Sequence, residues 1–374
     1  MQTLKKAPDK TVGTKSMKAN RSPVEDVARL ASVPIHAPFN GVDRVVRGLA
    51  SRALVWCAAS LTLVCFPATA SASSEALAAV SRGSDPVRAE RTALFDLVKY
   101  NGGFLSVGER GVVMRSKDGG KTWLGIQAPT TRTLVAIVVV NEKTLVAVGH
   151  GGSIVRSDDA GQTWLAIDVP DTGGDSILGV TLLKDGRLLG FGAYGMYLVS
   201  EDQGKTWERR SVINEEFDRH ISKIVESGNS LYLVGETGTV ARSDDGGEHW
   251  TKLETPYQGS YFGLIALGDG DLLAYGMRGN VFRTRDGGAS WRQVPFESKS
   301  ALNGGYVTAD GRVVISGNNG LVAVSDGGVN EFALQYVPEG TPVAKAMYAE
   351  DGDLVYVGYL AAGRLPPNKA PVSR

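Results

Sequence analysis

The sequence predicts an all-β protein, specifically a β-propeller built from four-stranded blades. Three observations favour this fold class: a turn motif that returns about every 40 residues, four short β-rich segments in each repeat, and no helix-length amphipathic pattern after about residue 92. Repeats of this size cannot bury their apolar faces alone, so they stack, and closing the stack into a ring removes exposed strand edges. Seven blades are expected, with six as the alternative.

The motif first appears as SKDGGKTW at residues 116–123. It returns as SDDAGQTW (157–164), SEDQGKTW (200–207), SDDGGEHW (243–250) and TRDGGASW (284–291), and in a degenerate form as VSDGGVNEF (324–332). Its tryptophans are separated by 41, 43, 43 and 41 residues: Trp123, Trp164, Trp207, Trp250 and Trp291. A loop that binds one nucleotide or ion is needed once per site, so a copy in nearly every repeat indicates a structural part of each blade.

Three positions of the motif have identifiable roles. The acid at the third position can accept backbone N–H groups of the turn, and the glycine at the fifth suits a positive φ or a close backbone approach. The tryptophan is large enough to pack between neighbouring blades. A calcium loop would need more acids, and a phosphate loop would need a following helix where a strand is expected here. The acids are Asp118, Asp159, Asp202, Asp245 and Asp286, and the glycines are Gly120, Gly161, Gly204, Gly247 and Gly288.

Residues 134–168 show the pattern of one blade. LVAIVVV is rich in β-branched residues, and TLVAVG, SIVRS and TWLAID follow it with turn residues between them. The motif therefore lies between the third and fourth strands. The same pattern places blades at about 93–128, 134–169, 177–212, 220–255, 261–296 and 302–337.

The last repeat is incomplete in the sequence. Residues 343–361 offer two strands, and the segment at 85–92 is expected to complete them as a seventh blade. The propeller is thus predicted over 85–361, and residues 362–374 are predicted to form a C-terminal tail.

The N-terminal part has the features of an export signal. Residues 53–72 carry no charge, follow Arg47 and Arg52, and contain an apolar run that ends in small residues. This pattern is typical of a cleaved secretory signal peptide, and the run is short for a membrane span; an uncleaved anchor is the alternative. Residues 1–52 are predicted to be a poorly structured extension from a misassigned start codon. We expect an exported protein, periplasmic or extracellular, without a lipid anchor.

Charge and cysteine content exclude several function classes. From Ser73 onward the chain has 30 basic and 36 acidic residues, so its surface lacks the dense positive charge of nucleic-acid-binding proteins. Both cysteines, Cys57 and Cys65, lie in the predicted signal. Disulfides, thiol catalysis and cysteine-bound metals are therefore not expected in the exported part.

The motif S-x-D-x-G-x-T-W, within the longer pattern G-x-x-G-x-V-x-R-S-x-D-G-G-x-T-W, resembles the Asp-box or BNR-repeat propellers. Over residues 90–360 the chain looks like the photosystem II assembly and stability factor family of that group. This resemblance implies a seven-bladed, non-enzymatic propeller that binds proteins during assembly of a membrane complex. A sialidase-type glycosidase or carbohydrate-binding propeller is the alternative. The motif itself is specific for the fold and says little about function.

The family has a basic patch, and the matching position just before the motif carries a row of four arginines. Two interpretations fit this row: guanidinium groups presented to an acidic partner, or side chains that pack on the neighbouring blade and pair with acids of the motif. The third and sixth copies depart from the pattern, with Val199 in the third and Ala323 and Val324 in the sixth. The row consists of Arg115, Arg156, Arg242 and Arg283.

A partner-binding face is predicted at the turns between the second and third strands. These turns read GERG, GHGG, GAYG, GETG, GMRG and GNNG, so their frame repeats while their central residues differ in chemistry. A scaffold that carries a composite surface would show this pattern, although exposed turn residues also vary freely without function. The candidate residues are Arg110, His150, Tyr194, Glu236, Arg278 and Asn319.

Catalysis, metal binding and cofactor binding have little support. A sialidase needs three arginines, a tyrosine nucleophile with a glutamate, and an acid/base aspartate. Arg110, Arg278, Arg132, Tyr194 or Tyr257, Glu236 and Asp218 could be assigned to those roles, but any propeller of this size offers such residues. Outside the N-terminal extension only His150, His220 and His249 remain, without metal-ligand spacing. We expect no cofactor, no metal, a monomer, and one or more protein partners.

Overall fold

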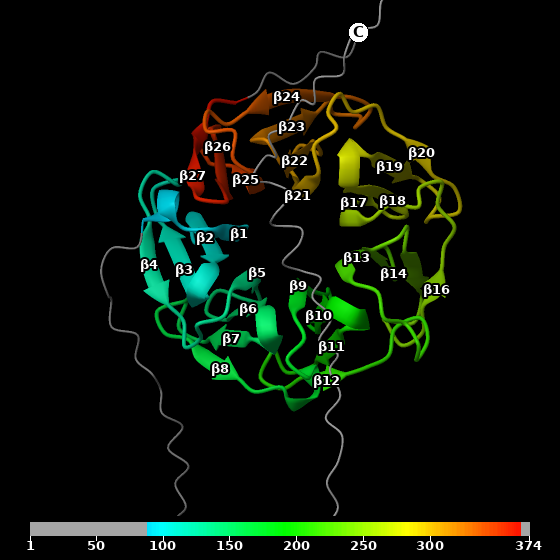
Figure 1. Ribbon diagram of the computed structural model, residues 1–374, viewed down its shortest axis with the longest axis horizontal. Coiled ribbons are helices and arrows are strands. Elements are labelled where there is room, and N and C mark those ends of the chain that lie inside the picture. Colours follow the sequence, from blue (N-terminus) through cyan, green and yellow to red (C-terminus); the bar gives the residue numbers. More distant parts are fainter. Residues whose placement is uncertain (1–87, 368–374) are drawn as a thin grey trace, which may run out of the picture. The chain divides into compact units, whose positions relative to one another are not determined.

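The computed structural model describes residues 88–367, which form seven antiparallel sheets arranged in a ring (Figure 1). The predicted seven-bladed propeller is confirmed. Within each sheet the strands follow one another in sequence order, so each blade is a meander with neighbouring strands paired. The predicted extension at 1–52 and the signal at 53–72 lie outside the described residues.

The first three blades cover residues 94–209. They contain β1 (Leu94–Tyr100), β2 (Gly103–Gly108), β3 (Val112–Ser116) and β4 (Leu124–Gln127); β5 (Leu134–Val139), β6 (Leu145–Gly149), β7 (Ile154–Ser157) and β8 (Leu165–Ile167); and β9 (Ile177–Leu182), β10 (Leu188–Gly192), β11 (Tyr197–Ser200) and β12 (Glu208–Arg209).

The next three blades cover residues 221–336. They contain β13 (Ile221–Ser227), β14 (Ser230–Gly235), β15 (Val240–Ser243) and β16 (Thr251–Lys252); β17 (Tyr261–Gly268), β18 (Asp271–Gly276), β19 (Val281–Thr284) and β20 (Arg292–Gln293); and β21 (Leu302–Val307), β22 (Val313–Gly317), β23 (Leu321–Ser325) and β24 (Phe332–Tyr336). All six fall within the ranges expected from the repeat.

The seventh blade differs from its prediction at both ends. It has three strands in the described part of the chain: β25 (Val343–Tyr348), β26 (Leu354–Gly358) and β27 (Ala361–Leu365). The propeller therefore continues past residue 361, and the predicted tail begins only after Leu365. Residues at the start of the described chain form a 3₁₀ turn, η1 (Ala89–Arg91), that packs against β27 and adds no fourth strand. The pattern hid β27 because Gly363 and Arg364 interrupt its apolar residues.

The core lies between neighbouring blades rather than within one. Each apolar cluster joins residues of two adjacent sheets, and the tryptophans of the repeated motif take part in them. Trp250, for example, meets Tyr197 of the preceding blade edge-to-face, with ring centroids 6.0 Å apart. The predicted role of the tryptophans is confirmed.

The repeated turn is held by its aspartate. Asp118 accepts the backbone N–H of Lys121 at 3.1 Å and of Thr122 at 2.9 Å, and the Thr122 hydroxyl donates to it at 2.6 Å. These bonds, led by the Thr122 hydroxyl, lower the pKa of Asp118 to about 2. Gly247 in the fourth blade has φ +97°, and a Cβ there would lie 2.2 Å from the Tyr197 hydroxyl. Both reasons expected for the glycine therefore hold.

A bulge in the innermost strand recurs in all seven blades. The register of β1 with β2 shifts between Leu94 and Asp96, and the same shift occurs at the matching place in every other blade. A bulge re-aims side chains by adding one unpaired residue. The extra residues line the central channel at one level: Phe95, Val135, Leu178, Ser222, Phe262, Asn303 and Ala344.

Candidate protein-binding face

The six predicted face residues all lie at one end of the ring. In an antiparallel meander the turns between second and third strands share an end with the connections to the next blade, opposite the repeated motif. In most blades the turn is a short 3₁₀ segment, as in η2 (Glu109–Gly111), η3 (His150–Gly152), η5 (Ala193–Gly195) and η6 (Met277–Gly279). The remaining 3₁₀ segment, η4 (Pro170–Thr172), lies in the connection between the second and third blades.

Each turn between a second and a third strand places the second of its two central residues in the left-handed region of φ. Non-glycine residues occupy it in six blades: Arg110 (φ 56°), Tyr194 (φ 51°), Thr237 (φ 53°), Arg278 (φ 58°), Asn319 (φ 58°) and Leu360 (φ 51°). Such a conformation is uncommon for residues with a Cβ and costs about 1 kcal/mol or more. All six side chains are exposed, so their packing does not compensate this cost.

Two of the predicted residues come together between blades three and four. The Tyr194 ring lies 5.0 Å from the His220 ring, measured between centroids, and is 57% exposed. His220 donates its backbone N–H to Glu236 at 3.0 Å, and its Nδ1 lies 2.8 Å from the same carboxylate. The bonds from His220 and the nearby charge of Arg219 lower the pKa of Glu236 despite its partial burial. The exposed Tyr194 and the carboxylate of Glu236 thus both contact His220.

The other predicted residues remain separate. Arg110 and Arg278 belong to blades one and five, and Asn319 of blade six donates to the Ser300 hydroxyl at 3.1 Å. His150 lies in the turn of blade two and is exposed to solvent. Partial desolvation of its ring lowers its pKa. The predicted set is thus a ring of dispersed side chains with one local cluster.

Sequence reasoning missed the turn of the seventh blade. Tyr359 and Leu360 are large exposed apolar residues at the equivalent position. Their turn reads GYLA, and Ala361 replaces the second glycine of the frame, so the repeat could not be recognised. The only available signal was the spacing from the turn of blade six.

The arginine row is engaged at the opposite end of the ring, in contacts between blades. Arg115 donates to the carbonyl of Ala160 at 3.2 Å, and Arg156 donates to the carbonyl of Gln203 at 2.9 Å, in each case in the repeated motif of the following blade. Arg283 does the same to Gly328 at 2.5 Å. These contacts correspond to the structural interpretation of the row, with backbone carbonyls as partners in addition to acids.

Two arginines outside the row make the same contact. Arg187 donates to the carbonyl of Gly246 at 2.9 Å. It makes this contact for the third blade, where Val199 occupies the position of the row arginine. Arg364 of β27 donates to the carbonyl of Gly119 and so joins the last blade to the first. Arg242 instead pairs with Asp244 at 2.7 Å and lies over the Tyr232 ring.

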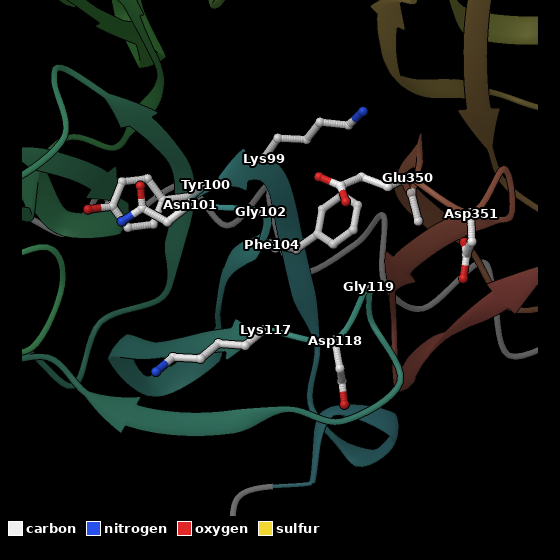
Figure 2. A pocket seen from close by; sticks show the side chains of 12 residues that line it. Lys99, Tyr100, Asn101, Gly102, Phe104, Lys117, Asp118, Gly119, Glu350 and Asp351 are labelled. Atoms are coloured by element: carbon white, nitrogen blue, oxygen red, sulfur yellow. The ribbon is translucent and has the colours of Figure 1, made fainter.

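A pocket of about 460 Å³ lies where the ring closes between blades one and seven. Figure 2 shows its residues, with the side chains of Lys99 and Lys117 pointing away from each other and the acids Asp118, Glu350 and Asp351 among them. The cations and anions are mixed, and Asp351 is already bound by Arg364 at 2.6 Å. The pocket therefore does not present a concentration of charge of one sign that would select a charged ligand.

Within residues 88–367 no group of three or more His, Cys, Asp or Glu side chains is placed to hold a metal ion. A search of the same stretch for helices with the length and apolar character needed to cross a membrane found none.

Comparisons with known proteins agree with this fold. Residues 176–339 match the sequence profile of the family described as photosynthesis system II assembly factor YCF48. A comparison with curated protein sequences finds no match. The structure is similar to YCF48 bound to a D1 peptide (TM-score 0.59, 16% identity, covering 74% of this chain and 94% of that one). It is also similar to YCF48 from Cyanidioschyzon merolae (TM-score 0.58, 16% identity, covering 74% and 95%).

Enzymes share the same architecture. A streptogramin B lyase is similar with a TM-score of 0.64 and 12% identity, over 76% of this chain and 96% of that one. At such identities the likeness shows the fold alone, so the function depends on the family match and on the side chains.

Proposed function

We propose that the chain, whose residues 176–339 match the photosystem II assembly factor YCF48 family, is an exported, non-enzymatic propeller that binds a protein partner. Its role is that of an assembly or accessory factor for a membrane protein complex. The family match carries this proposal. The similar structure of YCF48 bound to a D1 peptide supports it, because it pairs this fold with a peptide ligand.

The face that carries the turns between second and third strands is the surface we assign to the partner. Its exposed side chains combine cations, an ionised carboxylate and aromatic or aliphatic groups. Tyrosine and arginine are the residues that most often dominate binding energy at protein interfaces. The strained conformation of these exposed residues is consistent with a functional role.

Capture from detergent-solubilised envelope, followed by mass spectrometry, tests the proposal. The tagged mature protein should retain a membrane-protein partner, and the double variant Arg110→Glu with Arg278→Glu should retain at least tenfold less of it, because two charges are reversed. The variant Arg285→Glu with Arg292→Glu reverses two exposed charges near the repeated motif of blade five, at the other end of the ring, and should bind normally.

Two results would contradict the proposal. Partner binding at wild-type strength with both face arginines reversed would remove the face from the partner site. Failure to retain any partner, combined with hydrolysis of a chromogenic glycoside, would favour the glycosidase alternative.

A further inference from the structure

The central channel contains a cluster of three charged residues. A cavity of about 470 Å³ is lined by the innermost strands of all seven blades. Just below the bulge level, the seven equivalent positions hold three charged residues and four small ones. These positions are Asp96, Ala136, Gly179, Lys223, Gly263, Gly304 and Lys345.

The carboxylate of the cluster is fully engaged. Lys345 Nζ lies 2.7 Å from Asp96 Oδ1, and both side chains are largely buried. Asp96 also accepts the backbone N–H of Leu97 at 2.8 Å and of Ile137 at 3.0 Å. It therefore neutralises one lysine and has little capacity left for a second.

Lys223 is the unmatched cation. No hydrogen bond or ion pair engages its ammonium group among residues 88–367, and the side chain lines the cavity. Burial, and then the neighbouring charge of Lys345, lower the pKa of Lys223 to about 8 against the attraction of Asp96. Lys223 is only partly buried, and a cation with a lowered pKa that lines a cavity is a candidate ligand contact.

A neutral donor, Tyr275, lines the same cavity as the two lysines. The Tyr275 ring occupies the space that a side chain at position 263 would fill, because a Cβ on Gly263 would lie 2.2 Å from its hydroxyl oxygen. Burial and the charge of Asp96 raise the pKa of Tyr275, so the hydroxyl keeps its proton and can donate it.

We propose that the central channel binds a small oxyanion, a carboxylate or a phosphate, with Lys223 and Lys345 as its cationic contacts and the Tyr275 hydroxyl as a neutral donor. Two ammonium groups that share one committed carboxylate leave a net charge of +1, which an oxyanion would neutralise. The cavity of about 470 Å³ that these groups line has room for such an ion. The charged and titratable groups that face Lys223 across the channel are Asp96, Tyr275 and Lys345.

The test uses the full-length chain with inorganic phosphate and with acetate as probes, each against chloride at equal ionic strength and pH 7. Calorimetric titration should show binding of at least one probe, and Lys223→Met should weaken that binding by about tenfold or more, the equivalent of one lost charged contact. The matched control is Lys252→Met, an exposed lysine on the outer strand of the same blade, which should leave binding unchanged.

A second measurement keeps the proposal testable if Lys223→Met does not fold. In wild-type protein with ¹³C-labelled lysine, saturating probe should raise the pKa of Lys223 by about one pH unit, because a bound anion favours the charged ammonium. Phosphate stabilises most proteins non-specifically, so a rise in melting temperature alone is not sufficient. Absence of heat from both probes together with an unchanged Lys223 pKa would overturn the proposal, as would equal binding by wild type and Lys223→Met.

Discussion

Asp159 shows how much a single residue of the repeated turn holds in place. It accepts the backbone N–H of Gln162 at 2.9 Å and of Thr163 at 2.8 Å, together with the hydroxyls of Thr163 and Ser157. Four donors converge on one half-buried carboxylate. Without it, the turn between the third and fourth strands would lose the group that satisfies its backbone.

Replacement of Asp159 by Ala should destabilise the protein by about 1–2 kcal/mol, the usual cost of removing a side-chain acceptor that satisfies turn or cap N–H groups. Urea denaturation at pH 7 measures the change. Asp168→Ala removes an exposed acid after the last strand of the same blade and should change stability by less than about 0.5 kcal/mol. Equal losses in the two variants would show that Asp159 has no special role.

The roles of some residues could be predicted from the sequence, and those of others could not. The roles of the acid, glycine and tryptophan followed from their repetition, since each blade has to solve the same packing problem. The channel cluster could not be predicted, because Asp96 and Lys345 are far apart in sequence and meet only when the ring closes. Their placement also depends on bulges, which leave no clear pattern in single strands.

At the scale of elements, adjacent blades are joined by arginines as well as by apolar clusters. Arg283 on β19 is the most developed case: its side chain is 9% exposed, and it pairs with Asp271 of β18, which is 24% exposed, at 2.7 Å. The same guanidinium donates to the carbonyls of Gly328 and Val329 in the next blade. One buried cation thus connects three segments.

Replacement of Arg283 by Met should destabilise the protein by about 2–3 kcal/mol, because the aliphatic stem remains while Asp271 and two carbonyls lose their partner. Thermal and urea unfolding measure this loss. Arg285→Met, two residues along the chain and exposed, is the matched control and should be nearly neutral. If Arg283→Met has no larger effect than the control, the inter-blade contact contributes little to stability.

The strands themselves were predicted better than the contacts between them. Six blades follow from the repeat, because period-2 apolar patterns and glycine turns recur within each. The arginine row was predicted as a feature but with two possible roles, and only the spatial neighbourhood distinguishes them. A residue before the motif of one blade reaches the motif of the next at a distance of about 45 residues in the chain.

At the scale of the whole molecule, a feature that recurs in several blades affects the stability of the propeller several times over. Every good copy of the motif holds its aspartate ionised in the folded state. The Ser290 hydroxyl, followed by the Thr284 hydroxyl and the Ser290 N–H, lowers the pKa of Asp286 to about 2, from an ordinary value of 3.8. Hydrogen bonds within the turn lower the pKa values of Asp159, Asp202 and Asp245 in the same way.

The stability of the propeller should therefore fall as the pH drops from about 4 to about 2. In this window the unfolded chain binds protons at these carboxylates while the folded chain does not, so acid favours unfolding, and the contribution is complete above the ordinary pKa. Urea midpoints between pH 6 and pH 2 measure the loss. In Asp286→Asn the side chain keeps an oxygen acceptor and does not titrate, so the variant should be less stable than wild type at pH 6 and approach it near pH 2. A difference between the two proteins that stays constant across this range would show that ionised Asp286 is not what stabilises the turn.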